Sequence, residues 1–406
     1  AMMRSVRPGL VRLTRRLSTA PLPLWEGSSL PVASAECLPP TYYTREAVAA
    51  AERKMIFMRS WQYVPAAARA SDNGAFECGT HAGGVRYLLS RAKDGELRAF
   101  RNACRHHHHS VAKGSGTASQ FVCPYHGWTY GLDGRLTKAT GIGGIEGFKA
   151  KEHGLEKLPF EQTGVGSFAW LGRLPAGEQP PPIDDWLGEP SASALRAALS
   201  PLREAPDGAD ADVAQPPLRH VASRSYSVES NWKVFVDNYL DGGLHVPVAH
   251  KGLADNLDFG SYTTQAAGPH AVVQSVGGRA ERVGGTASYT YIWPNLMLNR
   301  YGGGDGAPRW LDANLVVPDL KEPHRRCVVY FDWFVEDWAA DDTKYVDESL
   351  AASEVVQQED MALCADVQLS LEADEGQRGR FAPKYEHGMH AFHRLVYETL
   401  QGAAAE

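Results

Sequence analysis

The 406-residue sequence lacks any apolar run close to the roughly 20 residues that a membrane-spanning helix requires, so we expect no membrane span. It also lacks an excess of basic residues: the formal net charge is −7 and the sequence pI is about 6.1. Nucleic-acid binding would need clustered positive charge, and is not expected. Hydrophobic residues (43%) and charged residues (22%) are ordinary for a globular chain long enough for two domains.

Cysteine is scarce, with six residues scattered along the chain. A disulfide framework is typical of short chains dense in cysteine, so we expect none here. Only Cys104 and Cys123 lie near histidines. The other four are expected to be buried small hydrophobic side chains: Cys37, Cys78, Cys327 and Cys364.

The first 20 residues lack acidic side chains. Five arginines precede Glu26, the first acidic residue, and four apolar residues recur at helical spacing: Arg4, Arg7, Arg12, Arg15 and Arg16, and Val6, Leu10, Leu13 and Leu17. A basic, amphipathic helix with Ser and Thr has the composition of an organelle transit peptide. We therefore expect residues 1–20 to direct the protein to the mitochondrial matrix or the plastid stroma. The alternative is a disordered basic tail.

Changes in composition divide the rest of the chain into an α+β protein. Residues 21–60 predict a linker or covering arm and then a helix capped by Thr44. Short β-prone stretches between turns predict a small antiparallel β domain over residues 61–172, and the Pro-rich residues 173–217 predict a connecting segment. Residues 218–406 predict an α+β domain with a mostly antiparallel sheet. Its expected helices are 226–250, 342–371 and 387–400, and its expected strands lie near 271–275, 287–293, 311–317 and 326–335.

Two short loops carry the first candidate metal site. Cys104 and His106 form Cys-x-His, and Cys123 and His126 form Cys-x-x-His. Two thiolates and two imidazoles suit either tetrahedral zinc or a [2Fe–2S] cluster. A zinc finger normally pairs like ligands and places its histidines on a helix, whereas a turn and a strand follow His126. One Cys and one His on each loop favours a Rieske cluster, in which the cysteines hold one iron and the histidines the other.

Three further histidines follow His106 in the sequence. The Cys-x-His hook favours His106 alone as the ligand. We predict that the other three are solvated or surround the ligands: His107, His108 and His109.

The second candidate metal site contains His245 and His250. On a regular helix this separation leaves the two side chains about 140° apart. Gly242, Gly243 and Pro247 would break or distort the helix and let the imidazoles converge. Two histidines and a distant carboxylate form the facial triad of non-haem Fe(II) oxygenases, which leaves positions open for oxygen and substrate. Taken alone, His-x4-His fits core histidines better, but downstream of the first site it indicates iron.

The carboxylate of this triad must come from elsewhere in the chain. Asp360 is the candidate, on a predicted amphipathic helix next to Glu359. Adjacent helical residues face about 100° apart, so only one of the two should reach the iron. In the alternative interpretation both belong to a solvated acidic face.

These motifs make the chain resemble the large subunits of Rieske non-haem iron oxygenases, and most closely the plant-type choline monooxygenases. The likeness spans roughly residues 40–400, and Cys123-Pro124-Tyr125-His126-Gly127-Trp128 is its most specific part. The other matching stretches are 231–251, 294–301, 359–364 and 388–393.

The resemblance implies a Rieske β domain joined to a helix-grip (START-like) catalytic domain. It implies a [2Fe–2S] cluster and a mononuclear Fe(II), electrons from NAD(P)H through a ferredoxin or flavin reductase, and O₂ as co-substrate. It also implies a homo-oligomer, commonly a trimer, in which one subunit's cluster reduces its neighbour's iron. The implied cluster ligands are Cys104, His106, Cys123 and His126, and the implied iron ligands are His245, His250 and Asp360.

Two other residues take roles from the resemblance. Asn238 matches an asparagine close to the iron. Many members have an acid three positions before the first iron histidine, which bridges it to a cluster histidine of the adjacent subunit. Gly242 occupies that position here, so we assign the bridging role to Asp241. Asp237 or a shifted loop is the alternative.

The choline enzymes carry two tyrosines beside the iron histidines, where this sequence has Leu244 and Val248. Aromatic faces commonly hold quaternary ammonium groups, at roughly 0.5–2 kcal/mol per ring. A cage could instead come from aromatic residues of the sheet, whose alternative role is in the core: Tyr291, Trp293, Tyr301 and Trp310.

The sequence therefore predicts a monooxygenase that hydroxylates a C–H bond of a choline- or betaine-like substrate, giving an aldehyde or N-demethylation. The first alternative is a hydroxylase of an aromatic or other apolar substrate, which Leu244 and Val248 would suit. Alternatives from other classes are an electron carrier with the cluster only and a zinc-binding interaction module.

Overall fold

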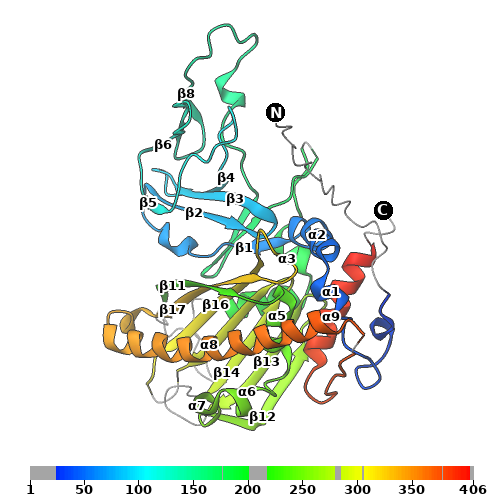
Figure 1. Ribbon diagram of the computed structural model, residues 1–406. Coiled ribbons are helices and arrows are strands. Elements are labelled where there is room, and N and C mark those ends of the chain that lie inside the picture. The colour runs from blue at the N-terminus through cyan, green and yellow to red at the C-terminus, as the bar shows by residue number, and fades with distance from the viewer. Residues whose placement is uncertain are drawn as a thin grey trace, which may run out of the picture.

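The computed structural model describes residues 24–175, 177–200, 217–278, 285–303, 306–376 and 378–402, so the predicted transit peptide lies outside the described residues. A smaller β domain stands on a larger domain in which helices flank a broad sheet (Figure 1). Within the described ranges, no helix combines the length and apolar character needed to cross a membrane. None of the six cysteines forms a disulfide, and Cys37 and Cys78 are half-buried rather than buried as predicted.

Three small antiparallel sheets form the β domain, which confirms the predicted architecture. The first has the order β1-β10-β9, the second β4-β3-β2-β5 and the third β6-β7-β8. The third sheet lies at the end of the molecule farthest from the large domain (Figure 1). The strands are β1 (Trp61–Tyr63), β2 (Ala75–His81), β3 (Val85–Arg91), β4 (Leu97–Arg101), β5 (Ser115–Thr117), β6 (Gln120–Val122), β7 (Thr129–Gly131), β8 (Leu136–Lys138), β9 (Phe160–Thr163) and β10 (Gly166–Trp170).

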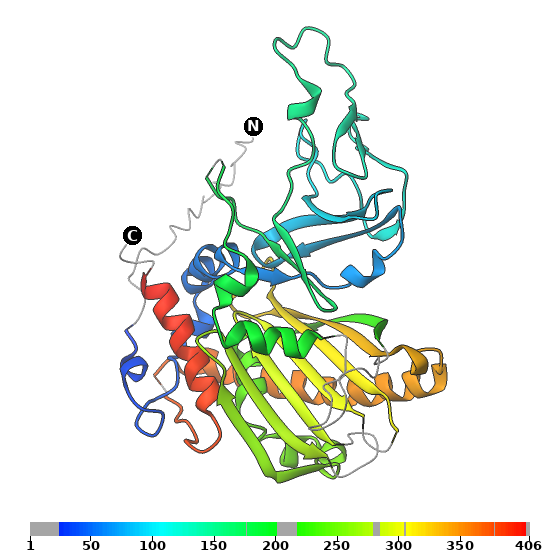
Figure 2. The same ribbon diagram turned by 180° about the vertical axis from the view of Figure 1, so that it is seen from behind.

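A seven-stranded antiparallel sheet forms the second domain, in the order β11-β17-β16-β15-β14-β13-β12. The long helix α8 (Thr343–Ala373) crosses one face of this sheet, and the view from behind shows α4 (Ser191–Leu199) on the other (Figures 1 and 2). The arrangement confirms the predicted α+β fold. The strands are β11 (Leu218–Val228), β12 (Leu257–Ala266), β13 (Ala271–Gly278), β14 (Thr286–Ile292), β15 (Leu296–Gly302), β16 (Arg309–Pro318) and β17 (Cys327–Glu336).

Several predicted boundaries were wrong. The expected helix 226–250 begins as the end of β11, and α5 (Trp232–Leu240) starts only after Asn231, whose side chain accepts the Lys233 N–H as N-cap. Thr44 does not cap α2 (Glu46–Met55), because it ends the preceding helix α1 (Thr41–Thr44). The predicted connecting segment contains α3 (Ile183–Leu187) and α4. Strands β11, β12 and β15 were not predicted.

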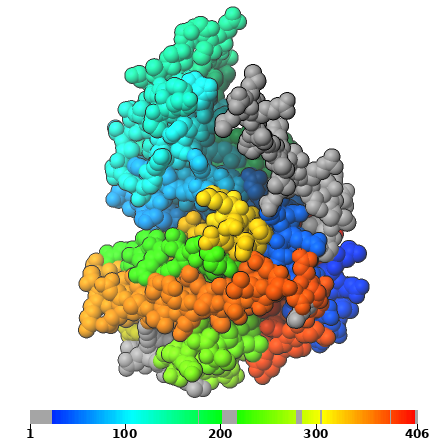
Figure 3. Space-filling model, viewed as in Figure 1, coloured from blue at the N-terminus to red at the C-terminus, as the bar shows by residue number. Residues whose placement is uncertain are grey.

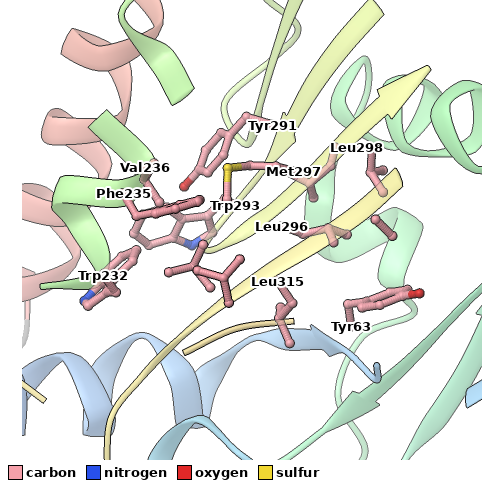
Figure 4. Packing of buried hydrophobic residues seen from close by; sticks show 14 of the residues in the cluster. Tyr63, Trp232, Phe235, Val236, Tyr291, Trp293, Leu296, Met297, Leu298 and Leu315 are labelled. Atoms are coloured by element: carbon pink, nitrogen blue, oxygen red, sulfur yellow. The ribbon is translucent and has the colours of Figure 1, made fainter. Parts of the chain in front are cut away.

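The core of the large domain lies between the sheet and helices α5 and α9 (His387–Gly402). Its largest fully buried side chains include Trp232, Trp310 and Trp333. Tyr291, Trp293 and Met297 pack with Trp232 and Phe235 in the same cluster (Figure 4). Burial of these aromatic rings supplies the main attraction between α5 and the sheet.

A buried ion pair joins α2 to α5. Lys233 Nζ lies 2.5 Å from Glu52 Oε1, and both side chains are at most 1% exposed. Trp232 Nε1 donates to Glu52 Oε2 (2.9 Å), and Lys233 Nζ also donates to Asn231 Oδ1 (2.7 Å). Burial lowers the pKa of Lys233 against the opposing effect of Glu52. Both charged groups are thus paired and hydrogen-bonded to a further polar side chain or ring N–H, which is the condition under which a buried pair is tolerated.

We expect Glu52→Gln and Lys233→Met each to lower the free energy of unfolding by about 3–5 kcal/mol, because each leaves one buried charge without its partner. The double variant should lose less than the sum, since no unpaired charge remains, although Trp232 would keep a weaker acceptor. Urea unfolding of the four proteins measures this coupling. Strictly additive losses would show that the two side chains do not interact.

Two candidate metal centres

Helix α5, which leads into the second site, ends at Leu240. Asp241 is its C-cap, and Gly242 and Gly243 both have φ near +73°. A Cβ atom at Gly242 would lie 2.6 Å from the backbone oxygen of Tyr385, and one at Gly243 would lie 2.8 Å from the ring of Tyr262. Side chains are therefore excluded at both positions by backbone conformation and by space. A new helix, α6 (Val246–Ala249), then starts with Pro247 in its first turn, so the predicted break is confirmed.

The break brings three candidate ligands together. The ligand atoms of His245, His250 and Asp360 all lie within 4.8 Å of one another. Asp360 Oδ1 is 2.9 Å from His250 Nε2 and 3.5 Å from His245 Nε2. The two imidazoles come from either end of α6 and the carboxylate from α8. Two imidazoles and one carboxylate facing a common point are the donor set that a non-haem Fe(II) site uses.

A carboxylate holds the other nitrogen of each histidine. Asp241 Oδ2 lies 2.7 Å from His245 Nδ1, and Glu359 Oε2 lies 2.6 Å from His250 Nδ1. Each Nδ1–H can therefore donate outward, which leaves the Nε2 lone pair facing Asp360. Burial would lower the pKa of His250, but hydrogen bonds to Asp360 and Glu359 outweigh it and raise the pKa.

Two further contacts were only partly predicted. Asn238 Nδ2 donates to Asp360 Oδ1 (2.8 Å), which places this asparagine beside the expected iron position. Asp241 also accepts the backbone N–H groups of Gly243 and His245. The role of Glu359 was missed: the helical spacing showed that it could not share Asp360's direction, but not that a second imidazole lay on its side of α8.

Asp237 does not take part in this cluster. Its Oδ1 lies 2.8 Å from His393 Nε2, and its Oδ2 accepts from the Tyr43 hydroxyl (2.7 Å). His393 Nδ1 in turn accepts the backbone N–H of Leu38. The alternative in which Asp237 replaces Asp241 therefore has no geometric support, since Asp237 instead links the N-terminal arm to α9.

The two cysteine loops of the first site have the same backbone turn geometry. Cys104 O accepts from His108 N (2.8 Å), and Cys123 O accepts from Gly127 N (2.9 Å). Each cysteine N–H donates to the carbonyl five residues further on, that of His109 or Trp128, at 2.8 Å. The residue four positions after each cysteine has a positive φ, 59° at His108 and 72° at Gly127. The two loops thus present one Cys and one His each from matching backbones.

The donors of these loops face each other. Cys104 and Cys123 are each 1% exposed, and the rings of His106 and His126 lie with centroids 4.6 Å apart. His106 Nδ1 is buried and has no hydrogen-bond partner among the described residues. A buried nitrogen without a partner is costly unless it binds a metal, so these residues fit a [2Fe–2S] cluster.

The surroundings of the cluster loops are aromatic. Trp128 stacks on His106 with centroids 4.9 Å apart, and the Tyr130 hydroxyl lies 3.2 Å from Cys104 Sγ. His107 lies beside His106 and His126 with an exposed side chain. His108 and His109 are also exposed.

A cavity of about 470 Å³ opens beside the second site. His245, His250, Asp360 and Asn238 are among its lining residues. Seven Phe and Tyr rings also line it, together with the buried Asp312: Phe235, Tyr239, Phe259, Tyr262, Tyr289, Tyr301 and Phe331. Most of these rings come from strands β12, β14 and β15.

The predicted cage residues are mostly elsewhere. Tyr301 lines the cavity, but Tyr291, Trp293 and Trp310 lie in the core and do not. The Tyr291 hydroxyl donates to Pro294 O, and Trp310 Nε1 donates to the Tyr345 hydroxyl. Figure 4 shows Tyr291 and Trp293 among the core side chains.

Leu244 and Val248 also lie outside the cavity lining. Leu244 is 39% exposed and Val248 is 77% exposed. Neither side chain therefore forms part of the cavity lining, contrary to the expectation that both lie at the substrate site.

The two domains match two different protein-family models. Residues 60–149 match the model of the Rieske [2Fe-2S] domain, and residues 217–402 match that of the ring hydroxylating alpha subunit (catalytic domain). The chain is 36% identical over 385 residues to "Choline monooxygenase, chloroplastic" of Arabidopsis thaliana, covering 92% of this chain and 85% of the relative. It is 30% identical over 225 residues to the carnitine monooxygenase oxygenase subunit of Acinetobacter pittii, 55% of each.

Solved structures of Rieske oxygenases have the same fold as this chain. A quaternary ammonium Rieske monooxygenase crystallised with its substrate L-carnitine aligns with a TM-score of 0.72 at 25% identity, over 91% of this chain and 97% of that one. Naphthalene 1,2-dioxygenase from Rhodococcus, with indole bound, has a TM-score of 0.71 at 19% identity over 91% and 95% of the two chains, which shows a shared fold.

Asp360→Ala is expected to abolish substrate oxidation and to lower the iron content from about three to about two atoms per chain, because one of three iron ligands is lost. The visible spectrum of the [2Fe–2S] cluster should persist, since the cluster loops do not contact α8. Asp366→Ala, an exposed aspartate on the same helix, is the matched control. If Asp360→Ala also removed the cluster spectrum, Asp360 would be a structural residue.

Proposed function

The chain belongs to the Rieske non-haem iron oxygenases, and from this premise we propose that it hydroxylates a C–H bond of a choline- or betaine-like quaternary ammonium compound. The chain is a Rieske non-haem iron monooxygenase with a [2Fe–2S] cluster and a mononuclear iron. The observation that carries the substrate proposal is the aromatic cavity beside His245, His250 and Asp360. The printed names of the relatives, choline and carnitine monooxygenases, support the same class.

Seven residues would hold the two metal centres. When bound, these centres supply electron storage and oxygen activation: one atom of O₂ enters the substrate and the other leaves as water with two electrons and two protons. The proposed cluster ligands are Cys104, His106, Cys123 and His126, and the proposed iron ligands are His245, His250 and Asp360.

The chain's other residues would keep these ligands oriented. Asp241 and Glu359 accept the Nδ1 protons of His245 and His250, so neither imidazole can rotate its Nε2 away from Asp360 without losing a charged hydrogen bond. The Asn238 amide donates to Asp360 Oδ1 and orients the carboxylate. Because His245, His250 and Asp360 all line the cavity, a substrate bound there would place its reacting carbon beside these ligands.

Tyrosine faces would attract the ammonium group. Hydroxyl contacts orient three of the cavity rings: Tyr239 donates to Asn299, Tyr262 to Gln274, and Tyr301 to Asp312. Asp312 adds a buried carboxylate to the cavity wall. Rings and carboxylate together favour a positive, poorly hydrated ligand over a neutral arene.

The chemistry predicts distinguishable products. Hydroxylation at the carbinol carbon of a choline gives a hydrate that collapses to an aldehyde. Hydroxylation of an N-methyl group gives a demethylated amine and formaldehyde.

We expect a single-turnover reaction of anaerobically reduced, iron-loaded protein to oxidise or demethylate an ammonium compound from a panel of choline, carnitine, other betaines and simple arenes. Mass spectrometry identifies the product. Tyr289→Leu should raise the KM for that substrate about 2- to 30-fold, the worth of one cation–π contact, whereas Tyr289→Phe should not. Oxidation of arenes alone would instead favour the aromatic hydroxylase.

We also propose a ring of subunits, in which the cluster of one subunit faces the iron of the next. The third sheet, which flanks the cluster loops, lies at the opposite end of the molecule from α6 and α7 (Lys251–Ala254), which adjoin the iron site (Figure 1). Electron tunnelling falls steeply with distance, so transfer within one chain is disfavoured. A contact between two different surfaces closes into a ring, and a trimer is the ring implied by the family.

Exposed apolar side chains occur on both surfaces. The cluster end exposes Val122 (49%), Tyr125 (61%) and Ile145 (52%). Around the iron site, α8 lies open along the molecule's face (Figure 3). The exposed apolar residues there are Leu244, Val248, Val355, Leu363 and Val367. Exposed apolar patches of this kind mark contacts between proteins. Asp241, which lies 2.7 Å from His245 Nδ1, is the proposed bridge from the iron site to a cluster histidine of the next subunit.

Val248→Glu is expected to dissociate the assembly and to lower turnover at least about 10-fold, because it places a charge in a desolvated contact. Light scattering reports the assembly, and the cluster spectrum should be unchanged. Leu369→Glu, an exposed leucine (62%) further along α8, serves as the matched control. An intact ring in Val248→Glu would remove this surface from the proposed contact.

We propose that the protein acts in the plastid stroma. The basic N-terminal segment supports import into an organelle. The relatives named "chloroplastic" favour the plastid over the mitochondrion. Electrons would come from NAD(P)H through a ferredoxin or a flavin reductase.

A further inference from the structure

Two side-chain amides in the wall of the aromatic cavity carry a polar atom without a partner. Asn314 of β16 is 5% exposed and Gln357 of α8 is 4% exposed, and both residues line the cavity. Within the part of the chain that the structure describes, no hydrogen bond reaches the buried Asn314 Oδ1 or the buried Gln357 Nε2. Buried polar atoms are nearly always hydrogen-bonded, so this amide pair, Asn314 and Gln357, indicates a partner that is not part of the protein.

Three other side-chain amides line the cavity, and each of them bonds within the protein. Asn238 donates to Asp360 Oδ1, and Asn299 accepts from the Tyr239 hydroxyl, each at 2.8 Å. Asn256 donates to a backbone carbonyl, also at 2.8 Å. These three amides have their role in the protein's own hydrogen bonds, whereas the amide pair keeps its hydrogen-bonding capacity for a ligand.

The cavity wall offers the amide pair's ligand carboxylates but no basic side chain. Its acidic members are Asp312, Glu359 and Asp360, and none of the lining residues that the structure describes is Lys or Arg. A ligand carboxylate buried there would lack a cationic side chain as its partner, which is costly. A hydroxyl needs no such partner, because it donates to the oxygen of one amide and accepts an N–H of the other, and rotation of an amide by 180° exchanges these two groups. The wall therefore fits a neutral hydroxyl better than a carboxylate.

The amide pair also lies close to the proposed iron ligands. Gln357 precedes Asp360 by three residues on α8, and side chains at this spacing are neighbours on one face of a helix, with Cβ atoms about 5–6 Å apart. Asn314 pairs across the sheet with Met297 and with Phe331, which both line the cavity. A hydroxyl held by Gln357 would thus lie beside the iron ligands and leave the tyrosine rings to the cationic end of the same molecule.

We propose that Asn314 and Gln357 bind the hydroxyl of a quaternary ammonium alcohol, and so select both the substrate and the carbon that is oxidised. The carbon that carries the hydroxyl would lie beside the iron ligands, ahead of the N-methyl groups. One atom of O₂ enters a C–H bond of that carbon, and the other leaves as water with two electrons from the reductase and two protons. The hydrate then loses water and becomes an aldehyde. The inference rests on the proposed function and narrows its two classes of product to one.

The test uses the full-length, iron-loaded holoenzyme in its oxidised form, so that compounds bind without turnover. Calorimetry gives the Kd for choline, for propyltrimethylammonium, in which a methyl group replaces the hydroxyl, and for glycine betaine, in which a carboxylate replaces the carbinol group. Gln357→Met and Asn314→Leu each remove one amide at a similar side-chain volume. Gln358→Met, at the next position of α8, changes an exposed glutamine outside the cavity and is the matched control.

The unsubstituted protein should bind choline at least about 10-fold more tightly than either analogue, because only choline offers a hydroxyl and no carboxylate. Gln357→Met and Asn314→Leu should each lower the preference for choline over propyltrimethylammonium at least about 3-fold, and the double variant should abolish it. Since neither amide has a partner to lose, the Tm of these variants should not fall. Gln358→Met should keep the full preference. In single turnover of choline, the amide variants should release a larger share of formaldehyde.

Equal affinities of the unsubstituted protein for choline and propyltrimethylammonium would overturn the role of the amide pair, and so would tighter binding of glycine betaine. A parallel loss of affinity for both cations in the amide variants would overturn it too, because that loss is what a purely structural role produces. The proposed function is tested separately. If no ammonium compound binds or is oxidised, that function fails, whereas binding without a preference for the hydroxyl removes only the assignment of Asn314 and Gln357.

Discussion

Gly242 and Gly243 interrupt the helix that begins at Trp232, and the catalytic domain is organised around this break. A continuous helix would point His245 and His250 about 140° apart. The two positive φ angles end the helical path, and close contacts with Tyr385 and Tyr262 leave no room for a side chain at either glycine. The imidazoles can then meet Asp360 only if α5 and α8 keep their positions. Aromatic packing on the sheet and the Lys233–Glu52 pair hold α5 in place.

The two candidate metal sites orient their donors in different ways. The cluster loops use local backbone hydrogen bonds, with each cysteine carbonyl and N–H bonded within five residues. The iron site uses long-range side-chain contacts: Glu359 reaches His250 across 109 residues of sequence. Local geometry can be inferred from the spacing of residues, whereas a contact between α6 and α8 depends on the whole domain. Asp360 was therefore identified through the family resemblance rather than from spacing, and Glu359's contact was missed.

The same distinction explains which parts of the fold were predicted. Strands β13, β14, β16 and β17 and helices α8 and α9 have apolar patterns and lengths that match their burial, and their bounds were close. Strand β11 was missed because most of its residues are polar or half-exposed, and its stability comes from pairing with β17 along its whole length. The Thr44 cap was wrong because Pro40 starts an earlier turn, α1, that ends at Thr44.

The cavity beside the second site shows why neighbours of candidate metal ligands are poor guides to a pocket. Successive residues of a helix point about 100° apart, so only some residues next to a ligand can face the same side. Val246 of α6 lines the cavity, while Leu244, just before this helix, and Val248 within it are exposed and do not line it. The rings that line the cavity come from α5 and from strands β12, β14, β15 and β17 of the sheet. Leu244 and Val248 thus contribute nothing to the cavity wall, whose aromatic surface comes from α5 and the sheet.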